Sequence, residues 1–285
     1  MKSNIQLILA ALIWGCAFVA QSVSMEYIGP WTFNCVRFLI GGVTLTLLIP
    51  LLDRIRGKTE RMTWKNPSLY KAGLFCGLAL AAASMVQQIG IMYTTVGKAG
   101  FITALYVVIV PFLARLTGKT IKGNVWAAAL IAVAGLYLLS MSGVQSLTKG
   151  DAFLLGCAFL FAVHIMIIDH FGPSVDGIRL SCMQFYIAGA ICCVGMLLKE
   201  QPVLTDILAA AVPILYAGVM SCGAAYTLQI TGQLHADPAV ASILLSLESV
   251  FALLAGFVIL HQVLSIREVT GCVLMFAAIM LAQKS

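Results

Sequence analysis

Ten long apolar runs cover most of this 285-residue chain and decide what it can fold into. Each run is close to the roughly 20 residues that a helix needs to cross a bilayer. Lipid offers no hydrogen-bond partners, so each backbone group must be satisfied inside the segment, which predicts helices. A barrel would need alternating strands of about 9–11 residues, shorter than these runs. The runs are, in order, 5–25, 31–52, 69–92, 99–116, 124–142, 151–169, 180–198, 206–230, 239–261 and 267–283.

The composition agrees with lipid as the surrounding solvent. The chain is 61% hydrophobic and 10% charged, with a mean hydropathy of +1.01, whereas ordinary soluble domains are about 25% charged. We therefore predict an all-α integral membrane protein with ten transmembrane helices. The net charge of +6 is spread between the apolar runs and forms no basic patch, so nucleic acid is not an expected partner.

Basic residues between the runs predict the orientation of the chain. If the N-terminus lies inside, the inner segments carry twelve Lys and Arg residues and the outer segments five. The positive-inside rule then places both termini in the cytoplasm. The inner residues are Lys2, Arg54, Arg56, Lys58, Arg61, Lys65, Lys71, Arg115, Lys119, Lys122, Arg179 and Lys284; the outer ones are Arg37, Lys98, Lys149, Lys199 and Arg267.

Three short motifs recur in the second half of the chain, in the same order. Each second copy follows its first copy by close to half the chain length, which predicts an internal duplication into 1–143 and 144–285. Five helices per half would make the second half enter the membrane from the opposite side. Such inverted repeats build two similar gates around a central site. The motifs are Gly15-Cys16-Ala17-Phe18 and Gly156-Cys157-Ala158-Phe159, Cys35-x-x-Phe38-x-Ile40-x-Gly42 and Cys182-x-x-Phe185-x-Ile187-x-Gly189, and Gln87-x-x-Gly90 and Gln229-x-x-Gly232.

Motifs along the whole chain resemble the EamA group of the drug/metabolite transporter superfamily. They are Leu12-Ile13-Trp14-Gly15-Cys16-Ala17-Phe18, Gly29-Pro30 with Arg37-Phe38, Phe101-Ile102-Thr103-Ala104-Leu105-Tyr106 with Val110-Pro111, and Leu247-Glu248-Ser249-Val250-Phe251. The resemblance implies a ten-helix carrier of the inner membrane, usually an exporter of amino acids or related small metabolites. It also implies a central cavity built from the first four helices of each repeat.

Two departures from the family pattern bear on this prediction. The family usually has Pro where this chain has Ser249, and Pro breaks a helix while Ser only softens it. Pro111 keeps the break in the first half, so we expect the two gates to be unequal. The family often has Glu near the end of the ninth helix, where this chain has His261-Gln262, so no role of that acid carries over.

Glu248 is the sharpest candidate for a functional residue, because it lies about ten residues into the ninth run. A charge at mid-membrane costs about 2.5–3.5 kcal/mol on insertion scales, so it should face a cavity or a partner. One interpretation is coupling to a proton or to the substrate. The other is an interhelical hydrogen bond to a Ser, Gln or Tyr.

Arg37 and His164 each have two interpretations. Arg37 opens the second run on the predicted outer side, where it either attracts an anionic substrate group or snorkels at the interface. Its counterpart across the duplication is the uncharged Gln184. His164, late in the sixth run, either relays protons or is a hydrogen-bonded core histidine.

Amide and aromatic side chains complete the predicted cavity. Gln87 and Gln229 recur with a Gly three residues later, and amides both donate and accept hydrogen bonds, as a zwitterionic ligand requires. Trp14, Tyr106 and Tyr186 offer flat faces to such a cavity, although aromatic residues inside helices also serve packing.

Motifs of the common enzymes are missing. The nine cysteines form no Cys-x-x-Cys pair, and the chain has neither His-Glu-x-x-His nor Gly-x-Ser-x-Gly. We therefore predict no enzyme activity, no catalytic residue, no bound metal and no cofactor. The expected partners are a small-molecule substrate, with or without proton coupling, and the lipid bilayer, for a monomer or homodimer. The alternatives are a membrane-embedded enzyme, which would need clustered polar residues, and a channel, which would need a polar ring or a glycine-rich filter.

Overall fold

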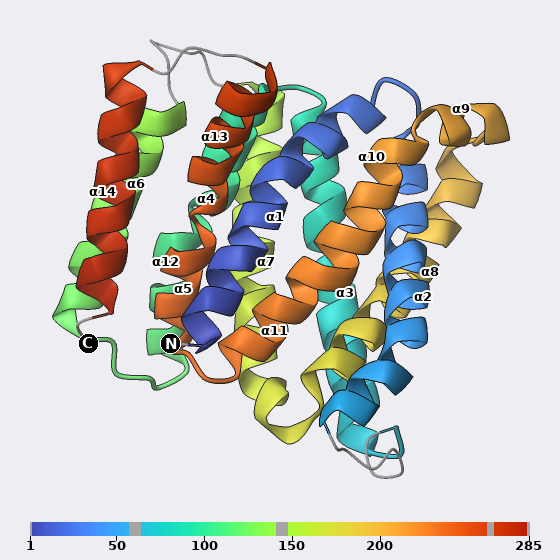
Figure 1. Cartoon of the computed structure of the whole chain (residues 1–285), viewed down its shortest axis with the longest axis horizontal. Coiled ribbons are helices and arrows are strands. Elements are labelled where there is room, and N and C mark those ends of the chain that lie inside the picture. The colour runs from blue at the N-terminus through green and yellow to red at the C-terminus, as the bar shows by residue number, and fades with distance from the viewer. Residues whose placement is uncertain (1, 57–63, 141–147, 261–264, 284–285) are drawn as a thin grey trace.

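The computed structural model describes residues 2–56, 64–140, 148–260 and 265–283, and its regular structure in these ranges is entirely helical (Figure 1). The elements are α1 (Lys2–Ser24), α2 (Pro30–Arg56), α3 (Pro67–Ile91), α4 (Val96–Ala104), α5 (Tyr106–Leu116), α6 (Gly123–Ser140), α7 (Lys149–Phe171), η2 (Gly172–Ser174), α8 (Gly177–Lys199), α9 (Leu204–Ala209), α10 (Ala211–Leu215), η3 (Tyr216–Tyr226), α11 (Thr227–Gln233), α12 (Pro238–Leu245), α13 (Glu248–Leu260) and α14 (Ile266–Ala282).

Eight of the described segments are long and apolar enough to cross a bilayer. They are α1, α2, α3, α4 with α5, α7 with η2, α8, α10 to α11, and α12 with the start of α13. The chain is therefore a multi-pass membrane protein, as its composition predicts. The shorter helices α6 and α14 pack against each other at one edge of the molecule (Figure 1). Ten spanning helices in two inverted repeats remain a prediction at this point.

Helices from the two halves of the chain alternate in the bundle. The helix α2 packs against α8, α3 against α7 and α8, and α1 against α11, η3 and α13. Small residues allow these close approaches. A Cβ atom added at Gly77 would lie 2.7 Å from Ile187 of α8, and one at Gly15 would lie 2.7 Å from the backbone of Ala252 in α13.

Two of the spanning segments are broken in the middle. One break lies at Leu105, between α4 and α5, and the other at Ser246 and Leu247, between α12 and α13. The expectation of a break at Pro111, in the first half alone, was wrong in both respects, because Pro111 lies inside α5 and the second half is broken too. In the second half no proline is needed, because the Ser246 hydroxyl donates to the Ile243 carbonyl (2.8 Å) and the Leu247 amide bonds the Leu244 carbonyl three residues back.

Helix boundaries are related by regular offsets between the two halves. The shift along the chain from the end of α1 to the end of α7 equals the shift from the start of α2 to the start of α8. We call this shift, which carries Lys2 to Lys149, the early offset. A slightly shorter shift carries the start of α4 to that of α12 and the start of α5 to that of α13. We call this one, which carries Val96 to Pro238, the late offset.

One of the three repeated motifs does not fit these offsets. The early offset pairs Gly15 of α1 with Ala162 of α7, and not with Gly156. The surroundings of the two glycines differ accordingly, since Gly15 packs against α13 whereas Gly156 faces only Val86 of α3. The interpretation of these two motifs as equivalent positions was therefore wrong.

Candidate substrate cavity

A cavity lies between the broken segments and the helices α1, α2, α3, α7, η3 and α11. About 30 Å³ is open at its centre, which is room for one or two water molecules. The lining residues are Trp14, Phe18, Gln21, Arg37, Gln87, Thr103, Tyr106, Phe161, Ile165, Ser221, Tyr226, Gln229, Leu245 and Glu248. Six of the eight residues that the sequence suggested therefore meet in one place.

Most of the wall is built from equivalent positions of the two halves. When the early offset is applied to α1 and the late offset to α3, α4 and α5, ten of the lining residues form five pairs. The cavity thus lies where the two halves of the chain meet. The pairs are Trp14 with Phe161, Phe18 with Ile165, Gln87 with Gln229, Thr103 with Leu245, and Tyr106 with Glu248.

Tyr106 and Glu248 face each other in this cavity. Each is the first residue after a helix break, and the Tyr106 hydroxyl donates a 3.0 Å hydrogen bond to Oε1 of Glu248. The carboxylate lies at the N-terminus of α13, where the free N–H groups favour a negative charge. The neighbouring Ser249 hydroxyl donates to the Gly100 carbonyl of α4 (3.2 Å), so both broken segments are also joined beside the cavity.

Arg37 is a cation buried in the cavity wall. Its side chain is 2% exposed, its Nε donates to Oδ1 of Asn34 (2.9 Å), and its guanidinium lies 5.0 Å from the centre of the Phe33 ring. Within the described residues, no carboxylate lies within ion-pair distance of this group. The interpretation as a snorkelling interface residue is therefore wrong. A buried charge that lacks an acidic partner is rare in proteins.

Four lining residues have buried polar atoms without a hydrogen-bond partner in the structure. They are Nε1 of Trp14, Oε1 of Gln21, Oγ1 of Thr103 and Oε1 of Gln229. Most buried polar atoms in proteins have a partner, because an unpaired one costs about 1–3 kcal/mol. Their gathering around one cavity indicates that a polar ligand or water completes the site.

The element η3 is a π-helix, and it shapes one wall. Its i→i+5 hydrogen bonds bring residues five apart close to one another, and Ser221 and Tyr226 both line the cavity. The Tyr226 ring packs edge-on against Trp14, with the ring centres 4.7 Å apart. The equivalent stretch of α3 is α-helical. This difference explains why Ser221 and Tyr226 have no counterparts in the wall.

His164 and Tyr186 lie outside this wall, contrary to expectation. His164 is fully buried and its Nε2 bonds Oε1 of Gln184 (2.9 Å), which agrees with the interpretation as a core histidine. Tyr186 is 37% exposed and its hydroxyl bonds that of Thr46 (2.8 Å) between α2 and α8. Each therefore pairs with a neighbouring helix.

Eight lining residues are not among the eight predicted site residues. Phe161, Ile165 and Leu245 are apolar and belong to none of the motifs, so nothing distinguished them from other core residues. The repeat was a usable signal, because the offset that pairs Cys35 with Cys182 also pairs Trp14 with Phe161. Within the described ranges, no three His, Cys, Asp or Glu side chains are grouped to hold a metal ion. The eight residues are Phe18, Gln21, Thr103, Phe161, Ile165, Ser221, Tyr226 and Leu245.

Comparison with known proteins agrees with this architecture. A model of the EamA-like transporter family matches residues 1–141 and again residues 148–283. The chain belongs to the EamA-like transporter family. It is 30% identical to an "Uncharacterized transporter" of Archaeoglobus fulgidus over 99% of this chain and 85% of that protein. It is 27% identical to the "Uncharacterized transporter YwfM" of Bacillus subtilis over 98% of this chain and 94% of that protein.

A solved crystal structure has the same fold as this EamA-like chain. It superposes with a TM-score of 0.80 over 99% of this chain and 96% of that chain, at 19% identity. At this sequence identity the match shows that the two chains share a fold, and it shows nothing about function.

Proposed function

We propose that this chain is a secondary active transporter that exports small zwitterionic metabolites, such as amino acids, by alternating access. Its two halves, 1–143 and 144–285, would form inverted repeats of five spanning helices each in the cell inner membrane. Both termini would face the cytoplasm. The observation that carries the proposal is the small cavity, lined by equivalent positions of both halves, in which Arg37 and Glu248 are buried.

Reciprocal contacts support the inverted repeats. A Cβ atom at Gly42 would lie 3.1 Å from the Tyr186 ring, and one at Gly189 would lie 3.0 Å from Leu39. The early offset carries Gly42 to Gly189 and Leu39 to Tyr186. Helices α2 and α8 therefore exchange the same contact, as two elements related by a twofold axis do. Two such halves around one site are the architecture of alternating access.

The size of the cavity supports a moving carrier. About 30 Å³ is too small for an amino acid, so the wall must separate before a substrate enters. The two helix breaks allow α4 to move relative to α5 and α12 relative to α13, because at each break the regular helical hydrogen bonds are interrupted.

The polar groups of the cavity suit the two ends of a zwitterion. The Arg37 guanidinium and the Trp14 indole N–H are donors for a carboxylate. Glu248 and the free amide oxygens of Gln21 and Gln229 are acceptors for an ammonium group. The aromatic rings between them would pack against an apolar side chain.

Glu248 also suits an exchange of substrate for a proton, because a buried carboxyl can be either paired or protonated. In that cycle the substrate ammonium and a proton would compete for the same carboxylate.

Binding and transport of defined zwitterions test this function. The purified protein is heated with amino acids, with their decarboxylated amines and with nucleosides; a bound ligand raises the melting temperature by mass action. The compound that stabilises it is then tested for counterflow in vesicles. We expect saturable counterflow of an amino acid. If no amino acid either stabilises the protein or is exchanged, the proposal is wrong.

A further inference from the structure

Charged residues join the two halves of the chain at both faces of the bundle. We call the face where α1 begins and α14 ends the terminal face, which is lower in Figure 1, and the opposite one the far face. Along the chain, α2 ends and α8 begins at the terminal face, whereas α4 and α7 begin at the far face.

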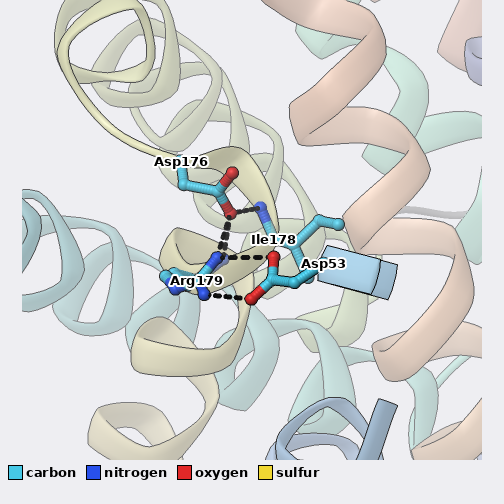
Figure 2. A network of polar contacts seen from close by, with 4 residues as sticks. All are labelled: Asp53, Asp176, Ile178 and Arg179. Carbon is cyan, nitrogen blue, oxygen red and sulfur yellow. Dashed lines mark hydrogen bonds and ion pairs between the residues drawn. The ribbon is translucent and has the colours of Figure 1, made fainter. Parts of the chain in front are cut away.

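The terminal face holds a buried cluster around Arg179. Its guanidinium bonds both carboxylate oxygens of Asp53, which lies near the end of α2, and reaches Oδ1 of Asp176 at 3.5 Å (Figure 2). Asp176 also caps α8 by accepting from the Ile178 and Arg179 amides. Arg179 is 1% exposed and Asp53 5%. The cluster fastens α2 to α8 with an ion pair shielded from water.

The equivalent contact at the far face has no ion pair. By the early offset, Glu200 corresponds to Asp53 and Thr32 to Arg179. The Glu200 carboxylate accepts from the Trp31 amide (2.9 Å), the Thr32 amide (2.8 Å) and the Thr32 hydroxyl (2.6 Å). The position equivalent to the cap residue Asp176 is Gly29, where a side chain has no room, because a Cβ atom would lie 2.3 Å from the Glu200 carboxylate. An acid therefore fastens α2 to α8 at both ends, but it meets a cation only at the terminal face.

The far face has its ion pair elsewhere, between α4 and α7. Lys98 Nζ lies 2.7 Å from Oδ2 of Asp151, and the two side chains are 4% and 2% exposed. The same oxygen accepts from the Thr148 amide (2.7 Å). The equivalent positions at the terminal face, between α12 and α1, are Val240 and Asn4. That contact contains no charge.

Resting on the proposed function, we propose that these two ion pairs latch the two gates: Lys98 with Asp151 closes the far face, and Asp53 with Arg179 closes the terminal face. Each pair joins one residue of the first half to one of the second, so rocking of the halves must break it. Each pair is nearly dry while its face is closed, so replacing one partner leaves an uncompensated buried charge, which destabilises the closed state of that face. Neither equivalent contact contains an ion pair, so each latch acts at one face only, and the two open states depend on different residues.

Opposite responses of the two faces test the latches. Hydrogen exchange is followed in the full-length protein in lipid nanodiscs, at residues 94–100 and 148–154 for the far face and at 50–56 and 176–182 for the terminal face. We expect Asp151→Asn to speed exchange at the far face about tenfold and to slow it at the terminal face. Asp53→Asn should give the reverse. Faster exchange around each substitution, with no slowing at the other face, would show local loosening and overturn the proposal.

Two further variants keep the test decisive. Lys98→Gln breaks the far-face pair without touching the cap of α7, so it should reproduce Asp151→Asn even if the latter folds poorly. Asp169→Asn removes the ion pair between Asp169 and Lys119, in which the Lys119 side chain is 39% exposed and that of Asp169 15%. We expect this variant to leave the hydrogen-exchange rates at both faces unchanged. If the wild type neither binds nor exchanges any solute, the proposed function fails. If transport is intact but hydrogen exchange changes in the same direction at both faces, only the proposal of the latches is wrong.

Discussion

Tyr106 and Glu248 lie in opposite halves of the chain, yet they share a 3.0 Å hydrogen bond in the cavity. Each begins the second part of a broken segment, and the late offset carries one residue to the other. One bond therefore joins equivalent positions of the two halves. Neither broken segment can swing away from the cavity while the bond is intact, so under the proposed function the bond would connect substrate binding to the state of the breaks.

We expect Tyr106 and Glu248 to be energetically coupled. Tyr106→Phe leaves the buried carboxylate without its donor, and a double-mutant cycle with Glu248→Gln should give a coupling of about 0.5–3 kcal/mol. Thermal unfolding of the four proteins measures it. Thr103→Val is the matched control, because the Thr103 hydroxyl has no partner. The change in the free energy of unfolding caused by Thr103→Val should add to that caused by Glu248→Gln. If the change caused by Tyr106→Phe also simply adds to that of Glu248→Gln, the prediction is contradicted.

Glu248→Gln should abolish the pH dependence of transport. The amide fills the same space and can bond Tyr106, but it does not exchange a proton. Initial rates in vesicles between pH 5.5 and pH 8.5, on the order of the range that a carboxyl or histidine covers, measure the effect. His164→Gln is the control, since His164 lies outside the cavity wall, and it should keep the wild-type profile. A flat profile in that variant would assign the proton to His164.

Arg37→Gln should weaken binding of zwitterions by about tenfold or more, because hydrogen bonds to a charged group contribute about 1.5–3 kcal/mol. The loss should be specific to the carboxylate. The variant should bind an amino acid and its decarboxylated amine about equally, whereas the wild type prefers the amino acid. Calorimetry on both ligands checks this. A variant that still prefers the amino acid would show that another donor holds the carboxylate.

Gly29→Ala should destabilise the protein, because the added Cβ atom would meet the Glu200 carboxylate at 2.3 Å. Displacing that carboxylate leaves the Trp31 and Thr32 amides unpaired, at a cost of about 1–3 kcal/mol. The melting temperature in detergent measures the loss. In a Glu200→Ala background the same change meets no carboxylate and should cost much less. Gly97→Ala, with nothing within 4 Å of its Cβ position, is the control.

The membrane fold follows from local properties of the chain. Apolar runs of about 20 residues can only be helices in lipid, because their backbone groups have no other partners. Spacing between motifs was also informative: the shift that pairs Gln87 with Gln229 also pairs Tyr106 with Glu248. It failed for Gly15 and Gly156, because two short matches in an apolar chain arise easily by chance.

The prediction that His261-Gln262 replaces a family acid lies outside the described residues, as do the extra basic residues of 57–63. The positions of Arg37, Lys98 and His164 were beyond the reach of sequence reasoning. Each lies near the end or the middle of an apolar run, where a polar residue can face lipid headgroups, a neighbouring helix or a cavity.

The sequence by itself determined that the chain crosses the membrane, that short motifs recur in its two halves and that Glu248 needs a partner. Tertiary structure alone decided which face of each helix turns inward, and with it that Arg37 lines the cavity, that Lys98 meets Asp151 and that α12 breaks before α13. The physical reason is that lipid and protein interior are both apolar. A membrane helix therefore carries no strong polar face to show its orientation, and only the packing of small residues and buried polar groups against other helices sets it.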